Sequence, residues 1–85
     1  RAGEALGELR LATTLSPDDA RYVYVYAVAL NSSGKPEQAI LVLQGAHNRH
    51  PNNRDILGAL VAFHRDMGND AAAQAYAAKL RSLAP

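Results

Sequence analysis

The chain has 85 residues, no cysteine and a formal net charge of +1, with few aromatic side chains. This length limits it to one small domain, and the balanced charge gives no electrostatic reason to expect nucleic acid or a membrane surface as a partner. Without cysteine, disulfides and thiolate metal sites are excluded. No apolar run approaches the about 20 residues of a membrane-spanning helix. Because the chain begins with Arg1 and not Met, we expect a processed or excised piece.

Four residue types recur along the chain at an interval of 34 residues. Proline lacks an N–H group and begins or ends helices, whereas glycine commonly follows a helix C-terminus. Prolines and glycines that alternate half a repeat apart therefore predict two helices per repeat. The recurring positions are Pro17, Pro51 and Pro85; Gly34 and Gly68; Ala5, Ala39 and Ala73; and Leu9 and Leu43.

Five helices are predicted in chain order, at about residues 2–15, 18–32, 36–49, 53–67 and 70–83. The second follows Ser16, which we expect to be its N-cap, with Pro17 in the first turn and Asp18 and Asp19 at the positive end of the helix dipole. Pro36 and Glu37 open the third helix, Asn52 or Asn53 caps the fourth, and Asn69 and Asp70 open the fifth.

One segment conflicts with this helical pattern. Residues 22–26 alternate tyrosine and valine, which is typical of a β-strand. A lone strand has no partner elsewhere in the chain, and the spacing of Val23, Tyr26, Ala27 and Leu30 fits one face of a helix. We therefore predict a helix here.

With small and large apolar residues at fixed offsets and a closing proline, the chain resembles the tetratricopeptide repeat family. The resemblance covers the whole chain and implies an all-α fold, an α-solenoid of antiparallel helix pairs in a right-handed superhelix. The first full repeat, 18–51, carries Val23, Tyr26, Ala27, Leu30, Gly34, Ala39, Leu43, Ala46 and Pro51. The second, 52–85, carries Leu57, Leu60, Val61, His64, Gly68, Ala73, Ala77, Leu80 and Pro85. Residues 1–17, with Ala5, Leu9, Ala12 and Pro17, match the second helix of an incomplete repeat.

Both repeats depart from the family pattern, the second at more positions. Leu30 and His64 stand where a large aromatic residue is usual, Val61 replaces a small residue, and Ala77 replaces a bulky one. We expect looser packing in the second repeat. Repeat arrays usually need about three units and a polar cap. Two and a half repeats therefore suggest a piece of a longer array or a homo-oligomer formed through the open ends.

A binding groove is expected along the first helices of the repeats, which line the concave side of such arrays. On the second and fourth helices the unused face is apolar in the middle and charged at both ends. Gly58 and Ala62 would allow a partner backbone to come close, and Tyr24 would supply an aromatic anchor. The predicted groove residues are Arg21, Tyr24, Val25, Val28, Asn31, Asp55, Gly58, Ala59, Ala62 and Arg65.

Some proteins of this family grip a C-terminal carboxylate with Lys, Asn and Arg residues, but the matching positions here hold Tyr24, Val28, Asp55 and Ala59. The resemblance thus implies a groove for an apolar peptide or helix without that carboxylate clamp. Intramolecular packing on the rest of a parent protein remains open, because exposed apolar patches mark either role.

No enzymatic, metal or cofactor site is expected. His47 and His50 could share a helix face, but a zinc site needs three or four ligands. His50 is expected to be solvated and His64 to be a hydrogen-bonded core residue. No nucleophile, phosphate-loop or dinucleotide motif occurs. We expect a protein interaction module in the cytoplasm. The alternatives are a structural or oligomerisation segment of a larger multi-repeat protein, or a regulatory appendage of an enzyme.

Overall fold

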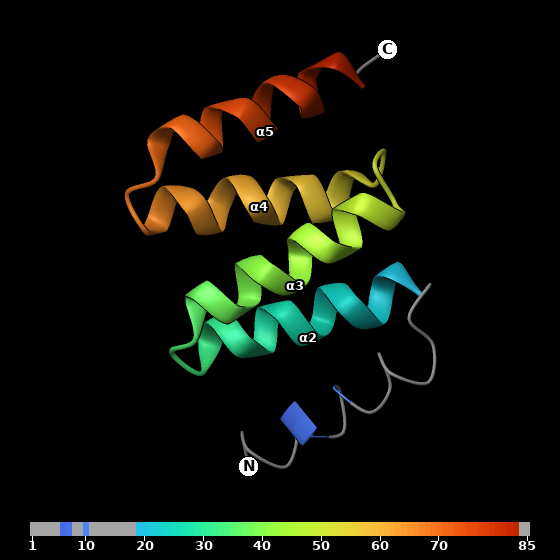
Figure 1. Cartoon of the computed structure of the whole chain (residues 1–85), viewed down its shortest axis with the longest axis vertical. Helices are drawn as coiled ribbons and strands as arrows, with labels where there is room; N and C mark the ends of the chain where they lie inside the picture. Colours follow the sequence, from blue (N-terminus) through green and yellow to red (C-terminus); the bar gives the residue numbers. More distant parts are fainter. Residues whose placement is uncertain (1–5, 8–9, 11–18, 84–85) are drawn as a thin grey trace.

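The computed structural model of the chain describes residues 6–7, 10 and 19–83. Its helices are stacked in chain order along the long axis of the molecule (Figure 1). No strand occurs among the described residues, so the all-α class is confirmed for them. The predicted first helix, 2–15, lies mostly outside the described residues, and the count of five helices stays a prediction. The described helices are α2 (Ala20–Ser32), α3 (Pro36–Arg49), α4 (Arg54–Asp66) and α5 (Asp70–Ser82).

Side-chain caps fix the starts of α2 and α4. The Asp19 carboxylate accepts a hydrogen bond from the Arg21 amide at 3.0 Å, and the Asn53 side-chain oxygen accepts one from the Ile56 amide at 3.0 Å. These two caps are 34 residues apart. Asp19, not Ser16, is therefore the N-cap of α2, and α2 begins two residues later than predicted because the Asp19 backbone is extended.

Glycine turns fix the ends of the same two helices. Gly34 and Gly68 have φ values of 80° and 79°, in the left-handed region that L-residues avoid. After each glycine, the next amide turns back onto the helix: Lys35 donates to the Leu30 carbonyl at 2.9 Å, and Asn69 donates to the His64 carbonyl at 2.8 Å. Carbonyls at the end of each helix are satisfied in this way.

The partner helices begin differently. Pro36 occupies the first turn of α3, where its missing N–H costs no hydrogen bond. Asn69 stands at the N-cap of α5, but its side chain makes no capping bond. The side-chain nitrogen of Asn69, Nδ2, instead lies 3.3 Å from His64 Nδ1.

The core runs between the three helices α2, α3 and α4. Residues 22–26 form part of α2, so the helical interpretation of this segment is confirmed. Small residues at the centre, such as Ala27 and Ala39, are fully buried and let α2 and α3 approach closely. The core residues are Val23, Ala27, Leu30, Ala39, Ile40, Leu43, Ala46, Ile56, Ala59, Leu60 and Phe63, with Leu6 and several others packed partly against them.

The 34-residue interval of the sequence is present in the backbone. α2 and α4 have 13 residues each and both their bounds are offset by 34. Pairs of turn and cap hydrogen bonds repeat at the same offset, for example Ala39 N to Lys35 O and Ala73 N to Asn69 O, both at 3.0 Å. The two described helix pairs are therefore built on the same local geometry.

The turns give a direct test of this geometry. No heavy atom lies within 4 Å of a Cβ placed on Gly34. The only cost of Gly34→Ala is therefore the conformational strain of an alanine in the left-handed region. We expect it to lower the free energy of unfolding by about 1 kcal/mol, measured by urea titration. Gly45→Ala is the matched control, because Gly45 is exposed within α3 and its added Cβ also meets nothing. That change should raise stability by about 0.5–1 kcal/mol. Equal effects of the two substitutions would contradict the turn assignment.

Candidate functional site

A pocket lies between the N-terminal ends of α2 and α4. Its volume is about 120 Å³, and its lining residues are Ala20, Arg21, Tyr24, Asn53 and Asp55. α2 and α4 touch each other directly as well as through α3. The capping bonds of Asp19 and Asn53 hold the two helix ends that form its walls.

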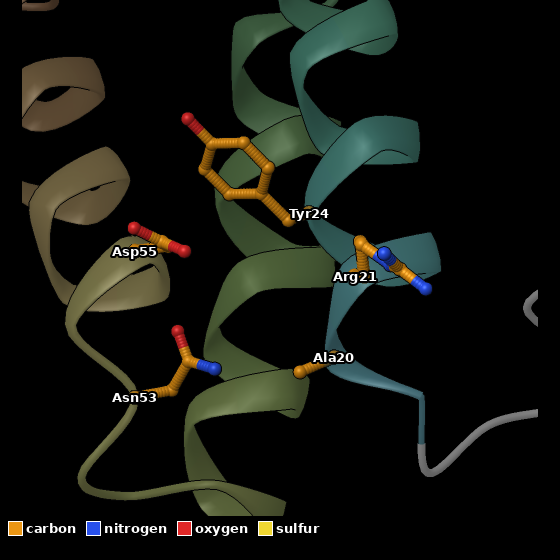
Figure 2. A pocket seen from close by; sticks show the side chains of 5 residues that line it. All are labelled: Ala20, Arg21, Tyr24, Asn53 and Asp55. Atoms are coloured by element: carbon orange, nitrogen blue, oxygen red, sulfur yellow. The ribbon is translucent and has the colours of Figure 1, made fainter.

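Side chains from the two helices face each other across this pocket. Figure 2 shows the Tyr24 ring extending from α2 toward α4, and the Asp55 carboxylate extending from α4 toward α2. The Arg21 guanidinium points away from Asp55 (Figure 2). The structure therefore brings together three of the predicted groove residues, although one of the three is turned outward.

Most of the remaining predicted residues lie further along the same helices and do not line the pocket. Val28 is 38% exposed on α2, and Ala62 is exposed on α4. Gly58 and Asn31 are half-buried, and Arg65 is exposed. One turn of a helix separates Tyr24 from Val28 and Gly58 from Ala62, so these side chains continue the two walls away from the pocket.

Val25 and Ala59, which flank the predicted groove on α2 and α4, differ in their exposure to solvent. Val25 is 43% exposed, but Ala59, which lies 34 residues later, is only 9% exposed and belongs to the core. Ala59 is therefore not an open groove surface. The reason is that α4 packs against both α3 and α5, whereas α3 is the main neighbour of α2 among the described helices.

Two pocket residues were not predicted as part of the site. Ala20 and Asn53 line the pocket because it sits at the very start of both helices. Sequence reasoning assigned Asn53 only as a cap. The signal that could have found both is the N-terminal position itself, since residues around a cap border whatever lies beside the helix end.

A second cluster of side chains joins α3, α4 and α5. The Tyr76 ring of α5 stacks on His64, with ring centroids 5.7 Å apart and an interplanar angle of 15°. His47 of α3 meets the same Tyr76 ring edge-on at 5.6 Å and 87°. His64 is only 7% exposed, and its bond with Asn69 confirms the expectation of a hydrogen-bonded core residue.

The hydrogen bond from Lys79 fits a neutral His47 ring. Lys79 Nζ lies 3.4 Å from His47 Nε2 and carries only donors, so His47 Nε2 accepts and its proton sits on Nδ1. Asn69 Nδ2 lies 3.3 Å from His64 Nδ1. The other ring nitrogens, His47 Nδ1 and His64 Nε2, are buried and have no hydrogen-bond partner within the described residues. Burial, and then the positive charge of Lys79, lower the pKa of His47 below its ordinary value.

The histidines and acidic residues of the described part of the chain do not gather into a metal site. No group of three or more His, Asp or Glu side chains within them is arranged to hold a metal ion. His50 is half-buried with its Nε2 enclosed, so the expectation of a solvated ring was wrong. It is the C-cap of α3 and immediately precedes the turn at Pro51. None of the described helices has the length and apolar character needed to cross a membrane.

No family model matches this chain, and a search of curated proteins finds no match to it. The site is therefore defined by its own geometry: a small pocket lined by Ala20, Arg21, Tyr24, Asn53 and Asp55, with apolar and small side chains further along the same two helices.

The lowered pKa of His47 makes stability depend on pH. A histidine in the unfolded chain takes up its proton at about 6.5, whereas the folded protein takes it up at lower pH. The unfolded state therefore binds more protons as pH falls below about 6.5, and folding is destabilised there. The full contribution is present above that pH. We expect the urea midpoint to fall between pH 7.5 and pH 5.5.

His47→Gln isolates this contribution, because glutamine has no charge to gain and His50 and His64 remain in both proteins. The pH dependence of the urea midpoint should be smaller in the variant. The same slope in both proteins would show that His47 is not the responsible group.

Proposed function

We propose that this chain is a tetratricopeptide-like interaction module that binds an apolar peptide or helix in the groove between α2 and α4. The single observation that carries this proposal is the pocket lined by Tyr24 and Asp55. Exposed Val28 and the small residues Gly58 and Ala62 lie further along the same two helices. Small side chains let a partner backbone approach closely, and an aromatic residue with a polar tip is a common anchor in interfaces. The module has no catalytic role in this proposal, and the cytoplasm is its expected compartment.

An amphipathic helix or an extended apolar segment fits the groove by shape. Val28 and Ala62 provide apolar contact, while the polar residues at the groove ends provide a rim. Interfaces of this kind combine a buried apolar centre with a polar edge. Gly58 supports the proposal, since a Cβ at this position would meet nothing in the protein and the fold itself has no steric need for glycine there.

Substitutions on one helix test the groove. Tyr24→Asp places a charge in the groove and should abolish binding of peptides selected from a displayed random library against the wild-type protein. Tyr22→Asp is the matched control, because residues two apart on a helix point to nearly opposite sides and Tyr22 is 43% exposed. The control should bind as wild type does. Loss of binding in both variants, or in neither, would place the binding face elsewhere.

Tyr24 also packs partly against the core, so a second pair of variants keeps the core intact. Ala62→Glu fills the groove from an exposed position, and Ala71→Glu makes the same change on the exposed surface of α5. Only the first should weaken peptide binding, by about tenfold or more, as measured by fluorescence polarisation. Circular dichroism melting should be unchanged in both.

A structural role is the second candidate, and one observation favours it. Tyr22 and Val25 are each 43% exposed, whereas their counterparts one repeat later, Ile56 and Ala59, are buried. α2 therefore presents an apolar stripe at positions that α4 uses for packing. In this alternative the stripe docks on a further repeat or on another copy of the chain.

Solution mass separates the two candidates. For a self-contained binder we expect a monomer by sedimentation equilibrium across a hundredfold range of concentration. A dimer that dissociates in Val25→Ser, with the fold retained, would instead favour the structural role. Val28→Ser serves as the control, because Val28 has a similar exposure of 38% on the groove side of the same helix.

A further inference from the structure

α5 is the least buried of the four helices bounded above. Ala73 is the one buried residue of its 13, all of which the structure describes, whereas α3 buries Ala39, Ile40, Leu43 and Ala46. α5 packs on α4, and its backbone is not adjacent to that of α3; Figure 1 shows α4 lying between these two helices. Elements with few buried apolar contacts open at a lower free energy than the rest of a fold. The docking of α5 therefore depends strongly on individual side-chain contacts.

His47 reaches α5 from α3 with its side chain. Its Nε2 lies 3.4 Å from Lys79 Nζ, and its ring meets the Tyr76 ring edge-on with the centroids 5.6 Å apart. Both partners belong to α5, whereas His47 stands in the last turn of α3. Tyr76 also stacks on His64 of α4. His47 thus connects the second helix of the first pair to the second helix of the next pair.

The bond between His47 and Lys79 requires a neutral imidazole. A lysine ammonium has donors and no acceptor, so the bond uses the lone pair of His47 Nε2. A proton taken up at Nε2 occupies that lone pair, which ends the bond and places two positive charges next to each other. The other ring nitrogen, Nδ1, is enclosed without a hydrogen-bond partner among the described residues, so it gives the charged ring no replacement contact.

The charges on the surrounding helices do not offset this repulsion. After burial, the charge of Lys79 is the cause that lowers the pKa of His47. Glu37 and Asp70 lie in the first turns of α3 and α5, more than two turns before His47 and Lys79. On α4, Asp55 lines the pocket beside α2, and Asp66 stands at the far end of the helix from the last turn of α3. The neighbouring titratable rings include two further histidines, which can only add positive charge as pH falls: His50 and His64.

We propose that His47 is an acid-sensitive latch, which holds α5 to α3 across α4 while neutral and releases the last turns of α5 when it takes up a proton. A second contact at this end of α5 does not respond to pH. Arg54 Nη2 donates to the Leu83 carbonyl at 2.7 Å, and a guanidinium keeps its charge throughout. Proton uptake therefore loosens α5 and leaves the stack of α2, α3 and α4 in place. The latch is independent of the groove between α2 and α4.

Amide hydrogen exchange tests the latch. Protection factors are measured by NMR on the full 85-residue chain at pH 7.5 and pH 5.5. An open α5 leaves His47 with its ordinary pKa of about 6.5, so the open state binds more protons than the closed state below that pH and becomes more populated. We expect the protection of amides in the last turns of α5 to fall about two- to fivefold relative to that of α4 amides, the range of one exposed polar contact.

Three variants assign the response. His47→Gln cannot gain a charge but keeps an oxygen that can accept from Lys79, so the relative protection of α5 should no longer change with pH. His50→Gln is the matched control, because His50 is a half-buried histidine at the end of the same helix, and it should respond as wild type does. Lys79→Met removes both the donor and the repelling charge. Its α5 should be less protected than that of wild type at pH 7.5 and should change less between the two pH values.

Other results overturn the latch. An equal loss of protection in all four helices means that acid acts on the global stability alone. A response of α5 that persists in His47→Gln assigns the effect to another group. Unchanged relative protection of α5 in wild type, or a Lys79→Met variant with wild-type exchange at both pH values, shows that the contact with Lys79 does not hold the helix.

Discussion

The position of α2 beside α4 depends on four local constraints that recur with a single offset. The caps at Asp19 and Asn53 fix where the two helices begin, and the left-handed glycines at Gly34 and Gly68 fix where they end. Two helices of equal length with equal turns then pack on α3 in related ways, so that their first turns lie next to each other. The pocket exists because both of these turns are held by side-chain caps and cannot shift along the axis without breaking a hydrogen bond.

The regular parts of the fold could be predicted from the sequence because they depend on residue type. Proline, glycine and the capping residues have strong local preferences, and the interval of 34 predicted the bounds of α2 to α5 to within a few residues. The end of α2 was predicted at Ser32, where it is observed, since Gly34 dictates the turn. Its start was missed by two residues because Ser16, Asp18 and Asp19 can all cap a helix, and sequence alone does not rank them.

The site was harder to predict because exposure depends on neighbours. The helix periodicity assigned Tyr24 and Asp55 to one predicted groove, and both line the pocket, but it treated Val25 and Ala59 as equivalent. Ala59 is buried by the packing of α4 between α3 and α5, which is a property of the stack and not of residue 59. In the same way, His64 replaces the expected aromatic residue, and Tyr76 supplies the missing ring from α5 by stacking on it. The second helix pair is thus joined by polar aromatic contacts that the repeat pattern did not indicate.

The placement of the pocket at two helix N-termini has a consequence for local motion. Terminal turns are the parts of a helix that open most easily, because fewer hydrogen bonds hold them than hold its middle. A ligand that touches Tyr24, Asn53 and Asp55 together could bind only when the first turns of both α2 and α4 are formed. Its binding free energy would then be coupled to the fraying of α2 and α4, and amides such as those of Arg21 and Ile56 would exchange with solvent more slowly in the complex. Ligand binding at this pocket and formation of the first turns of α2 and α4 would be thermodynamically coupled.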